Sequence, residues 1–410
     1  MPVFPLGPAS VAQAVTEAGH EVKWLDLMGH TDVGRIIGEA VNGFNPDIIG
    51  VSIRNVDDQN IKDPTFFLPG VRNVVKLCKS ISDVPVVAGG AGYSIFPEAC
   101  LEYINADMGI KGEGEYAFPE LITRMEGNRP ISDIPGLYIA GKGSRLPAHF
   151  EKNLKCFSLP DPHMFPTSAY EGDKFFIPVQ TRRGCPIGCG YCSTRSIEGT
   201  VIRKYQPENI VRWLKAWADE DFNRFQFVDN IFNLPADYAI ELCSKIIKAS
   251  LSIKWRCILY PGSMDEELAS LMSKAGCDEV SLGFESGDDE ILAGMNKGFS
   301  SAEALRTINI LLHNNIRVMG FLLMGWPGET KDTVLRSLDF VESSGVNSLK
   351  VTTGIRIYPE TRLEKIAKEQ GVIDRYDNLL FPKFYLARGL EGWIERIVKE
   401  RAECNTSWIV

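Results

Sequence analysis

The chain has 410 residues, of which 44% are hydrophobic and 24% charged, as is usual for a soluble globular protein of two or three domains. Its formal net charge of −9 argues against nucleic-acid binding, because phosphate backbones are bound by clustered basic residues. No apolar run is long enough to span a bilayer, and the N-terminus lacks the pattern of a signal peptide. We therefore expect a cytoplasmic protein with neither membrane nor nucleic-acid partners.

Helical and strand patterns alternate through residues 1–125, which predicts a doubly wound α/β domain with a parallel sheet. Helices are expected at Leu6–Glu17, Val33–Val41 and Val71–Ser80 and from Pro97, and strands at Glu21–Leu27, Asp47–Ile53, Pro85–Gly90 and Asp107–Lys111. Such a fold usually opens with a strand, whereas here a helix begins close to Met1. A first strand is therefore either missing from this chain or supplied in an unusual way.

Three strand-to-helix loops of this half are rich in glycine and polar residues, namely Ser52–Asp58, Gly89–Ser94 and Gly112–Glu115. Cofactors dock at such loops in a doubly wound sheet, because the carboxyl ends of parallel strands meet at one edge. Glycine lets a nucleotide-like tail approach the backbone closely. A tight turn, however, explains a glycine pair more often than a cofactor does.

Residues 126–177 combine hairpin-like pieces with a proline-rich stretch, which predicts a linker. Strand patterns resume at Phe176 and recur at Phe225–Val228, Lys254–Leu259, Glu279–Phe284, Val318–Met324 and Ser348–Thr353, with helices between them. About six βα units of this kind predict a partial barrel over residues 178–360. Residues 361–410 are expected to be largely helical.

The most specific motif is a run of three cysteines. Cys185, Cys189 and Cys192 have the spacing C-x3-C-x2-C on a glycine-rich loop. Three thiolates can hold three corners of a [4Fe-4S] cluster and leave the fourth iron open to a small molecule. The alternatives are unrelated buried thiols or a zinc site. A structural zinc site normally needs four protein ligands, and no other Cys or His follows Cys192 within about twenty residues.

This cysteine spacing is the signature of the radical S-adenosylmethionine (radical SAM) enzymes, which the chain resembles from Pro178 onward. The resemblance implies that the open iron binds S-adenosylmethionine and that reductive cleavage yields a 5′-deoxyadenosyl radical. Residues 1–125 resemble the cobalamin-binding domain that precedes the radical core in many such enzymes, with the loops at Gly89 and Gly112 carrying most of the likeness. The whole chain is thus similar to the cobalamin-dependent radical SAM methyltransferases, whose cofactors are a [4Fe-4S] cluster, S-adenosylmethionine and cobalamin.

In the first half, the resemblance implies a set of residues around cobalamin: Ser52, Arg54, Asn55, Gly89, Gly90, Tyr93, Gly112, Glu113 and Gly114. The chain lacks the Asp-x-His-x-x-Gly motif that supplies a histidine to cobalt in the best-known pattern. The lower face of the corrin is therefore expected to carry no histidine, and Arg54 is expected to face it as a catalytic candidate. The alternative for Arg54 is a salt bridge with Asp57 or Asp58.

In the second half, the resemblance implies that Cys185, Cys189 and Cys192 hold the cluster and that further residues hold S-adenosylmethionine. Tyr191 is expected to pack on the adenine, Asp229 to receive the ammonium group, Arg256 to pair with the carboxylate, and Glu285 and Ser286 to meet the ribose hydroxyls. For Asp229 and Glu329 the alternative is a helix cap. Arg356 and Tyr358 are substrate-side candidates at the barrel mouth, Tyr358 as a catalytic one.

The leading functional hypothesis is a C-methyltransferase that acts on an unactivated carbon through a 5′-deoxyadenosyl radical and methylcobalamin. A short C-terminal region favours a peptide or protein substrate, for which a glutamine of methyl-coenzyme M reductase is one candidate. The alternative is a cyclase or rearrangement enzyme that transfers no methyl group. A methylthiotransferase would need a second cysteine triad, whereas residues 1–125 contain only Cys78 and Cys100. A ferredoxin or flavodoxin is the expected electron donor.

Overall fold

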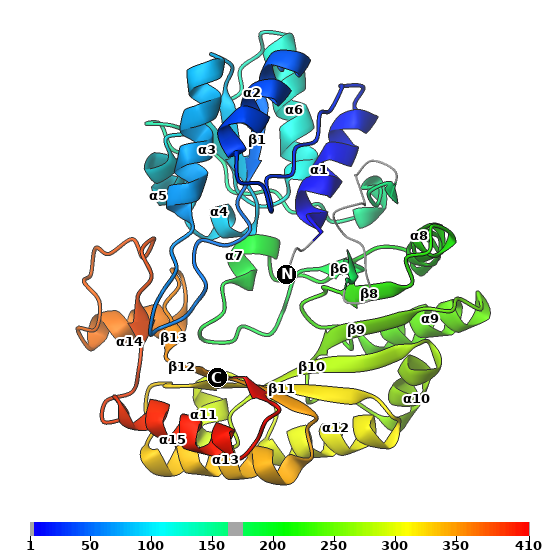
Figure 1. Cartoon of the computed structure of the whole chain (residues 1–410), viewed down its shortest axis with the longest axis vertical. Helices are drawn as coiled ribbons and strands as arrows, with labels where there is room; N and C mark the ends of the chain where they lie inside the picture. The colour runs from blue at the N-terminus through cyan, green and yellow to red at the C-terminus, as the bar shows by residue number, and fades with distance from the viewer. Residues whose placement is uncertain (1–3, 163–174, 410) are drawn as a thin grey trace. The chain divides into compact units, whose positions relative to one another are not determined.

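The structure, a computed structural model, describes residues 4–162 and 175–409 and divides into two compact units (Figure 1). The first unit comprises Met1–Asp173 with the short segments Ser196–Gly199 and Tyr376–Pro382, and the second comprises Lys174–Arg195, Thr200–Arg375 and Lys383–Val410. Each unit has its own main sheet. Among the described residues, no helix has the length and apolar character needed to cross a membrane.

The first unit is built on a four-stranded sheet in the order β1-β2-β3-β4. Its parallel strands are β1 (Ile49–Ser52), β2 (Val86–Gly89) and β3 (Met108–Ile110), and β4 (Leu137–Ile139) is antiparallel to β3. The helices are α1 (Leu6–Glu17), α2 (Val33–Phe44), α3 (Leu68–Ile81), α4 (Ala91–Ile95), α5 (Pro97–Ile104) and α6 (Gly114–Glu126). Val87, Met108 and Leu137 pack against Leu121 of α6 and form much of the core.

The strand expected at Glu21–Leu27 does not form, and these residues have no regular secondary structure. β1 is the edge strand of the sheet, so no described strand pairs with its outer side. Alternating apolar residues make a stable strand only when its backbone groups pair with a neighbour. The segment 21–27 has the composition of a strand but no partner. In contrast, Leu137–Ile139, from the segment interpreted as a linker, joins the sheet.

The second unit is built on a seven-stranded parallel sheet in the order β15-β12-β11-β10-β9-β8-β5. Its strands are β5 (Ile177–Val179), β8 (Arg224–Phe227), β9 (Lys254–Leu259), β10 (Cys277–Glu285), β11 (Arg317–Met324), β12 (Ser348–Thr353) and β15 (Trp408–Ile409). The longer helices are α8 (Pro207–Asp219), α9 (Ala236–Lys248), α10 (Glu266–Lys274), α12 (Ser301–His313), α13 (Lys331–Ser344) and α15 (Trp393–Glu403). The predicted alternation of strands and helices is confirmed, and β15 adds a strand that the sequence did not predict.

The two faces of this sheet differ in burial. In β9, Trp255 and Cys257 are buried, whereas Ile258 between Cys257 and Leu259 is 40% exposed. Figure 1 shows α10, α12, α13 and α15 along one face of the sheet. The opposite face, called the inner face below, is lined by alternate residues of the central strands: Arg256 and Ile258, Ser281 and Glu285, Met319 and Phe321, and Lys350 and Thr352.

Candidate active site

The three motif cysteines lie on the loop between β6 (Arg182–Arg183) and α7 (Thr194–Glu198). All three are free thiols of intermediate burial. Burial raises the pKa of Cys189 to about 11, while the charge of Lys297 acts in the opposite direction. No three Cys, His, Asp or Glu side chains within residues 4–162 and 175–409 are gathered as a preformed metal site. The donor set fits a cluster, because thiolates are its natural ligands.

Close packing fixes the backbone of this cysteine loop. A Cβ at Gly190 would lie 2.7 Å from the ring of Trp326, which is buried. The Gly190 N–H donates to the Met295 carbonyl at 2.8 Å, and the Gly190 carbonyl accepts from the Leu363 N–H at 2.9 Å. Gly188 adopts a positive φ of 55°, which glycine tolerates without strain. The loop is therefore held in place by its neighbours on several sides.

A buried ion pair adjoins the cysteine loop. The Tyr191 hydroxyl donates to Glu285 Oε1 at 3.0 Å, and Lys297 Nζ donates to the same oxygen at 3.1 Å. The side chains of Lys297 and Glu285 are only 7% and 13% exposed. Burial alone would lower the pKa of Lys297, but the charge of Glu285, followed by Tyr191 and Cys189, raises it well above its usual value. Lys297 therefore stays protonated, close to the Cys189 thiol and the Glu285 carboxylate.

Glu285 itself has an unusual backbone conformation. Its φ is 63°, and the register between β10 and β11 shifts between Leu282 and Glu285. A non-glycine residue in the left-handed region costs on the order of 1 kcal/mol, and such strain gathers at functional sites. A bulge also redirects a side chain. The strain at Glu285 is consistent with a carboxylate that the fold must aim at Tyr191 and Lys297.

Sequence reasoning missed Lys297. It lies in a short connection between α11 (Asp289–Gly294) and α12, and its neighbours Asn296 and Gly298 do not mark it as a site residue. Only the folded chain brings it to Glu285, twelve residues earlier in the sequence. The sequence did hold one indication, because a carboxylate expected inside a barrel, as at Glu285, requires a cation nearby.

Asp229 has a different place from the one expected. The residue is fully buried, and its carboxylate accepts from the Thr181 N–H at 2.6 Å and the Arg182 N–H at 3.0 Å. Arg182, also buried, forms an ion pair with it at 3.3 Å. Both oxygens are thus used inside the protein, and a role in receiving an ammonium group is not supported. Asp229 instead anchors the segment that leads into the cysteine loop.

Arg256 and Ser286 also make contacts within the second unit. Arg256 lies opposite Glu279, six residues before Glu285, a separation of about 20 Å along a strand. Its guanidinium stacks on the ring of Phe176, 3.9 Å from the centroid, and its expected pairing with the methionine carboxylate stays a prediction. The Ser286 hydroxyl lies 2.9 Å from the Ser337 hydroxyl of α13 and accepts from the Asp288 N–H. Ser286 therefore faces the helix layer.

In the first unit, the structure brings the loops Ser52–Asp58, Gly89–Ser94 and Gly112–Glu115 together, as the sequence predicted. The Gly92 N–H donates to the Ile53 carbonyl at 2.9 Å, and the Gly112 N–H donates to Ser94 Oγ at 3.0 Å. The carboxyl end of β1 is followed by three exposed residues, Ser52, Arg54 and Asn55 around buried Ile53. Across the described part of the chain, no hydrogen bond or ion pair involves the Arg54 side chain, so the alternative pairing with Asp57 or Asp58 is not formed.

Two other residues of these loops, Tyr93 and Glu113, are buried and make contacts within the unit. Tyr93 is fully buried, with its ring against Gly109, and its hydroxyl has no hydrogen-bond partner among the described residues. Glu113 is 7% exposed and accepts from the Glu151 N–H at 2.7 Å. Both residues thus have internal contacts, and their expected roles toward cobalamin stay predictions.

The glycines of the same loops are explained mainly by close contacts within the unit. A Cβ at Gly90 would lie 2.7 Å from the Ile53 carbonyl oxygen, and one at Gly114 would lie 2.8 Å from a Val11 methyl of α1. The surroundings of Gly89 and Gly112 are looser. An added Cβ would lie 3.8 Å from its nearest atom at Gly89 and 3.3 Å from its nearest atom at Gly112. Internal packing therefore explains Gly90 and Gly114 better than it explains Gly89 and Gly112, whose expected approach to cobalamin stays a prediction.

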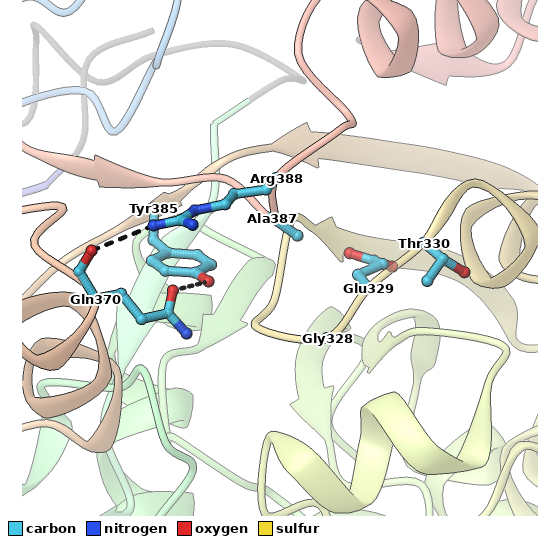
Figure 2. Close-up of a pocket in the computed structure, with 7 residues that line it drawn as sticks. All are labelled: Gly328, Glu329, Thr330, Gln370, Tyr385, Ala387 and Arg388. Carbon is cyan, nitrogen blue, oxygen red and sulfur yellow. Dashed lines mark hydrogen bonds between the residues drawn. The ribbon is translucent and has the colours of Figure 1, made fainter.

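A hollow of about 420 Å³ lies beside the loop that follows β11 (Figure 2). It is lined by Gly328, Glu329, Thr330, Gln370, Tyr385, Ala387 and Arg388. Figure 2 shows the Arg388 guanidinium above the Tyr385 ring, both tied to Gln370 by hydrogen bonds. Glu329 does not cap α13, whose cap is Thr330. It accepts instead from the Gly325 and Trp326 N–H groups of its own loop, and burial raises its pKa to about 7.

The substrate-side candidates lie beyond β12, near the short strand β13 (Ile355–Arg356), which pairs with β14 (Phe384–Tyr385). Arg356 is buried, donates to the Ile357 carbonyl at 2.7 Å and lies over the Tyr358 ring, 5.2 Å from its centroid. Tyr358 is half-buried. This arrangement gives both residues structural contacts, and their catalytic roles stay predictions.

Two family models match the chain in the expected order. Residues 1–122 match the B12 binding domain, and residues 179–341 match the radical SAM superfamily. The cysteine loop, Glu285 and Lys297 all fall within the second match. The two matched regions follow the two structural units closely.

Similar proteins share this arrangement. The chain is 27% identical to an uncharacterized methyltransferase of Pyrococcus horikoshii, with 88% of this chain and 78% of the relative covered. It is 24% identical to the tryptophan 2-C-methyltransferase of Streptomyces laurentii, with coverages of 90% and 73%. The structure of the radical S-adenosylmethionine methyltransferase TsrM from Kitasatospora setae, with cobalamin and a [4Fe-4S] cluster bound, superposes with a TM-score of 0.89 at 20% identity, covering 100% of this chain and 90% of that one. At this identity the likeness shows the shared fold.

Proposed function

Because the chain belongs to the cobalamin-dependent radical SAM methyltransferases, we propose that it transfers a methyl group to an unactivated carbon of its substrate. The family's cofactors are cobalamin, a [4Fe-4S] cluster and S-adenosylmethionine. One observation carries the proposal: a B12 binding domain and a C-x3-C-x2-C loop within a radical SAM domain occur in one chain. When bound, the cluster supplies an electron for cleaving S-adenosylmethionine, and cobalamin carries the methyl group.

The residues around the cysteine loop have the chemistry that S-adenosylmethionine requires. Cys185, Cys189 and Cys192 supply the thiolates for the cluster. Glu285 can accept hydrogen bonds from ribose hydroxyls, and the Lys297 ammonium can pair with the methionine carboxylate. The Tyr191 ring offers an aromatic surface to the adenine. In this proposal Lys297 takes the role that the sequence analysis gave to Arg256.

In the first unit, we propose that cobalamin is contacted by the open part of the loop edge. The exposed residues Ser52, Arg54 and Asn55 and the glycines Gly89 and Gly112 are the candidates that internal packing explains least. Arg54 is exposed and has no partner among the described residues, which supports a role toward the cofactor. An electron donor of the ferredoxin or flavodoxin class completes the reaction.

The substrate is a separate question. The short C-terminal region favours a peptide or protein, with a glutamine of methyl-coenzyme M reductase as one candidate, and no contact among the described residues bears on that hypothesis. The similar enzyme of Streptomyces laurentii is named for tryptophan, a small molecule. This relative favours a small-molecule substrate for the present chain as well.

Iron analysis tests the cluster assignment. We expect anaerobically reconstituted protein to carry one four-iron cluster and each of Cys185→Ala, Cys189→Ala and Cys192→Ala to abolish it. The buried thiol variants Cys78→Ala and Cys100→Ala are matched controls that should keep the wild-type iron and sulfide content. Loss of iron in either control, or its retention in the three loop variants, contradicts the assignment.

Electron paramagnetic resonance tests the cobalamin assignment. We expect the cob(II)alamin-loaded protein to show no nitrogen superhyperfine splitting, because the chain lacks the motif that places histidine on cobalt. Splitting that disappears in His30→Ala would contradict the unligated lower face. Arg54→Lys should change the cobalt spectrum without changing iron content, because a planar guanidinium and a flexible ammonium differ in shape and hydration.

A further inference from the structure

We propose that the inner face of the second unit's sheet binds an amphipathic anion as substrate, with its carboxylate or phosphate group paired to Lys350. The inference rests on the proposed function, because it assigns a substrate class to the same catalytic unit. It is carried by the position of Lys350, by the absence of a partner for its side chain among the described residues, and by the apolar side chains on either side of it.

Lys350 lies in the middle of β12 on the inner face. Its neighbours along the strand, Leu349 and Val351, are buried, whereas Lys350 itself is exposed. In register it stands beside Phe321 of β11 on one side and Ile409 of β15 on the other. Ile409 is 54% exposed. A cation is therefore flanked across the sheet by an aromatic and an aliphatic side chain.

The polar side chains of this part of the inner face have no partners in the described part of the chain. Over residues 4–162 and 175–409, no hydrogen bond or ion pair involves the side chain of Lys350, Ser281 or Thr352. Two other cations on this sheet are engaged, since Arg256 donates to Gln226 and Arg317 pairs with Glu279 at 3.3 Å. The side chain of Lys254, at the amino end of β9, has no hydrogen bond or ion pair among the described residues either. The charge of Lys350 is thus available, while an exposed apolar surface continues at Ile258.

Along the strand direction, Lys350 lies at nearly the same position as Glu285. Glu285 of β10 stands beside Leu322, and Phe321 stands beside Lys350, so the two charged residues are two strands apart and nearly in line. Two strand spacings correspond to about 10 Å. A small molecule anchored at Lys350 therefore has room for an apolar body that reaches toward Glu285. An apolar body with one acidic group matches a lone lysine between apolar side chains.

A solvated lysine on an exposed strand is the ordinary alternative, since long side chains often keep only the ammonium in water. The two cases differ in one measurable respect. A solvated lysine gives no preference for acids over neutral molecules of the same shape. A binding lysine does, and the preference disappears when its charge is removed.

The experiment measures binding of matched probes to the cofactor-loaded full chain by saturation-transfer NMR titration. The probes are 4-phenylbutyrate, 4-phenylbutyl phosphate, the neutral 4-phenylbutanol and a neutral tripeptide amide that contains glutamine. We expect at least one acid to bind roughly tenfold more tightly than the alcohol, as a charge-assisted contact provides. The better acid identifies the carboxylate or the phosphate as the preferred group.

Three variants locate the effect. Lys350→Gln should remove the preference for the acid, and Lys350→Arg should retain it. Lys254→Gln, which removes an exposed lysine at the amino end of β9, should leave it unchanged. Equal binding of acid and alcohol, a preference that survives Lys350→Gln, or binding of the tripeptide alone overturns the proposal. Cleavage of S-adenosylmethionine by the same samples is measured separately, so failure of the proposed function is distinguished from failure of this inference.

Discussion

At the scale of single residues, the contacts of Lys297 give the sharpest prediction. Lys297→Met leaves the buried carboxylate of Glu285 without its cation and removes the charge proposed to meet the methionine carboxylate. We expect S-adenosylmethionine binding, measured by equilibrium dialysis on the cluster-loaded protein, to weaken by roughly tenfold or more. Lys297→Arg should restore much of it at unchanged iron content. Equal affinity in wild type and Lys297→Met would remove Lys297 from the site.

Tyr93 gives a prediction about stability. Its buried hydroxyl has no hydrogen-bond partner among the described residues. Tyr93→Phe should therefore leave the free energy of unfolding unchanged or raise it by about 1 kcal/mol. The matched control is Tyr238→Phe, because the Tyr238 hydroxyl is also buried but donates to the Tyr205 carbonyl at 2.9 Å. That variant should lose about 1 to 3 kcal/mol. A comparable loss in Tyr93→Phe would show that its hydroxyl is used.

Glu329 gives a prediction about pH. Burial raises its folded pKa to about 7 from the model-compound value 4.5, so the folded protein binds more protons than the unfolded chain between these values. The stability contributed by the protonated form is complete below about pH 4.5 and is lost as pH rises through about 7, by about 3 kcal/mol in all. Glu329→Gln cannot ionise. Its unfolding free energy relative to wild type should therefore rise from pH 5 to pH 8, and a flat difference contradicts the burial of this carboxyl.

At the scale of elements, the close contact between Gly190 and Trp326 predicts how the cysteine loop depends on glycine. Gly190→Ala would bring a methyl group within 2.7 Å of the indole, so the loop must shift. We expect reduced iron content after reconstitution. Gly38→Ala is a suitable control, because Gly38 lies inside α2 with no atom within 4 Å of an added Cβ. Full iron loading of Gly190→Ala would contradict the tight packing of the loop.

The sequence predicted elements well where burial alternates along a strand. The bounds expected for Lys254–Leu259 and Ser348–Thr353 match β9 and β12, because apolar residues on one face of each strand pack under helices. The same logic was wrong at Glu21–Leu27, where a strand pattern has no neighbour to pair with. It also missed β15, whose two residues carry too little pattern to be recognised. Strand formation depends on partners, which local sequence does not specify.

The candidate site was predictable only in part, for a related reason. Spacing along the chain identified Cys185, Cys189 and Cys192, since they lie on one short loop. Asp229 and Arg256 were assigned from residue type, yet Asp229 is occupied by Arg182 and Arg256 stacks on Phe176. Lys297 was missed because its partner Glu285 is reached only through the turn of α11. Pairing of buried charges is a property of the fold.

At the scale of the whole molecule, the chain combines a B12 binding domain with a radical SAM domain, and the central claim is that both act in one reaction. The proposed reaction would use two molecules of S-adenosylmethionine per product, since one would supply the methyl group and the other would be cleaved reductively. The two uses leave different products, S-adenosylhomocysteine from the first and 5′-deoxyadenosine from the second. They can therefore be counted independently.

The most direct test is to quantify these products by mass spectrometry after the reduced, cofactor-loaded protein is incubated with S-adenosylmethionine and a candidate substrate. The account predicts one S-adenosylhomocysteine and one 5′-deoxyadenosine per methylated product, with 5′-deoxyadenosine absent in Cys189→Ala. Formation of 5′-deoxyadenosine without S-adenosylhomocysteine or a methylated product would indicate a cyclase or rearrangement enzyme and contradict the methyltransferase assignment.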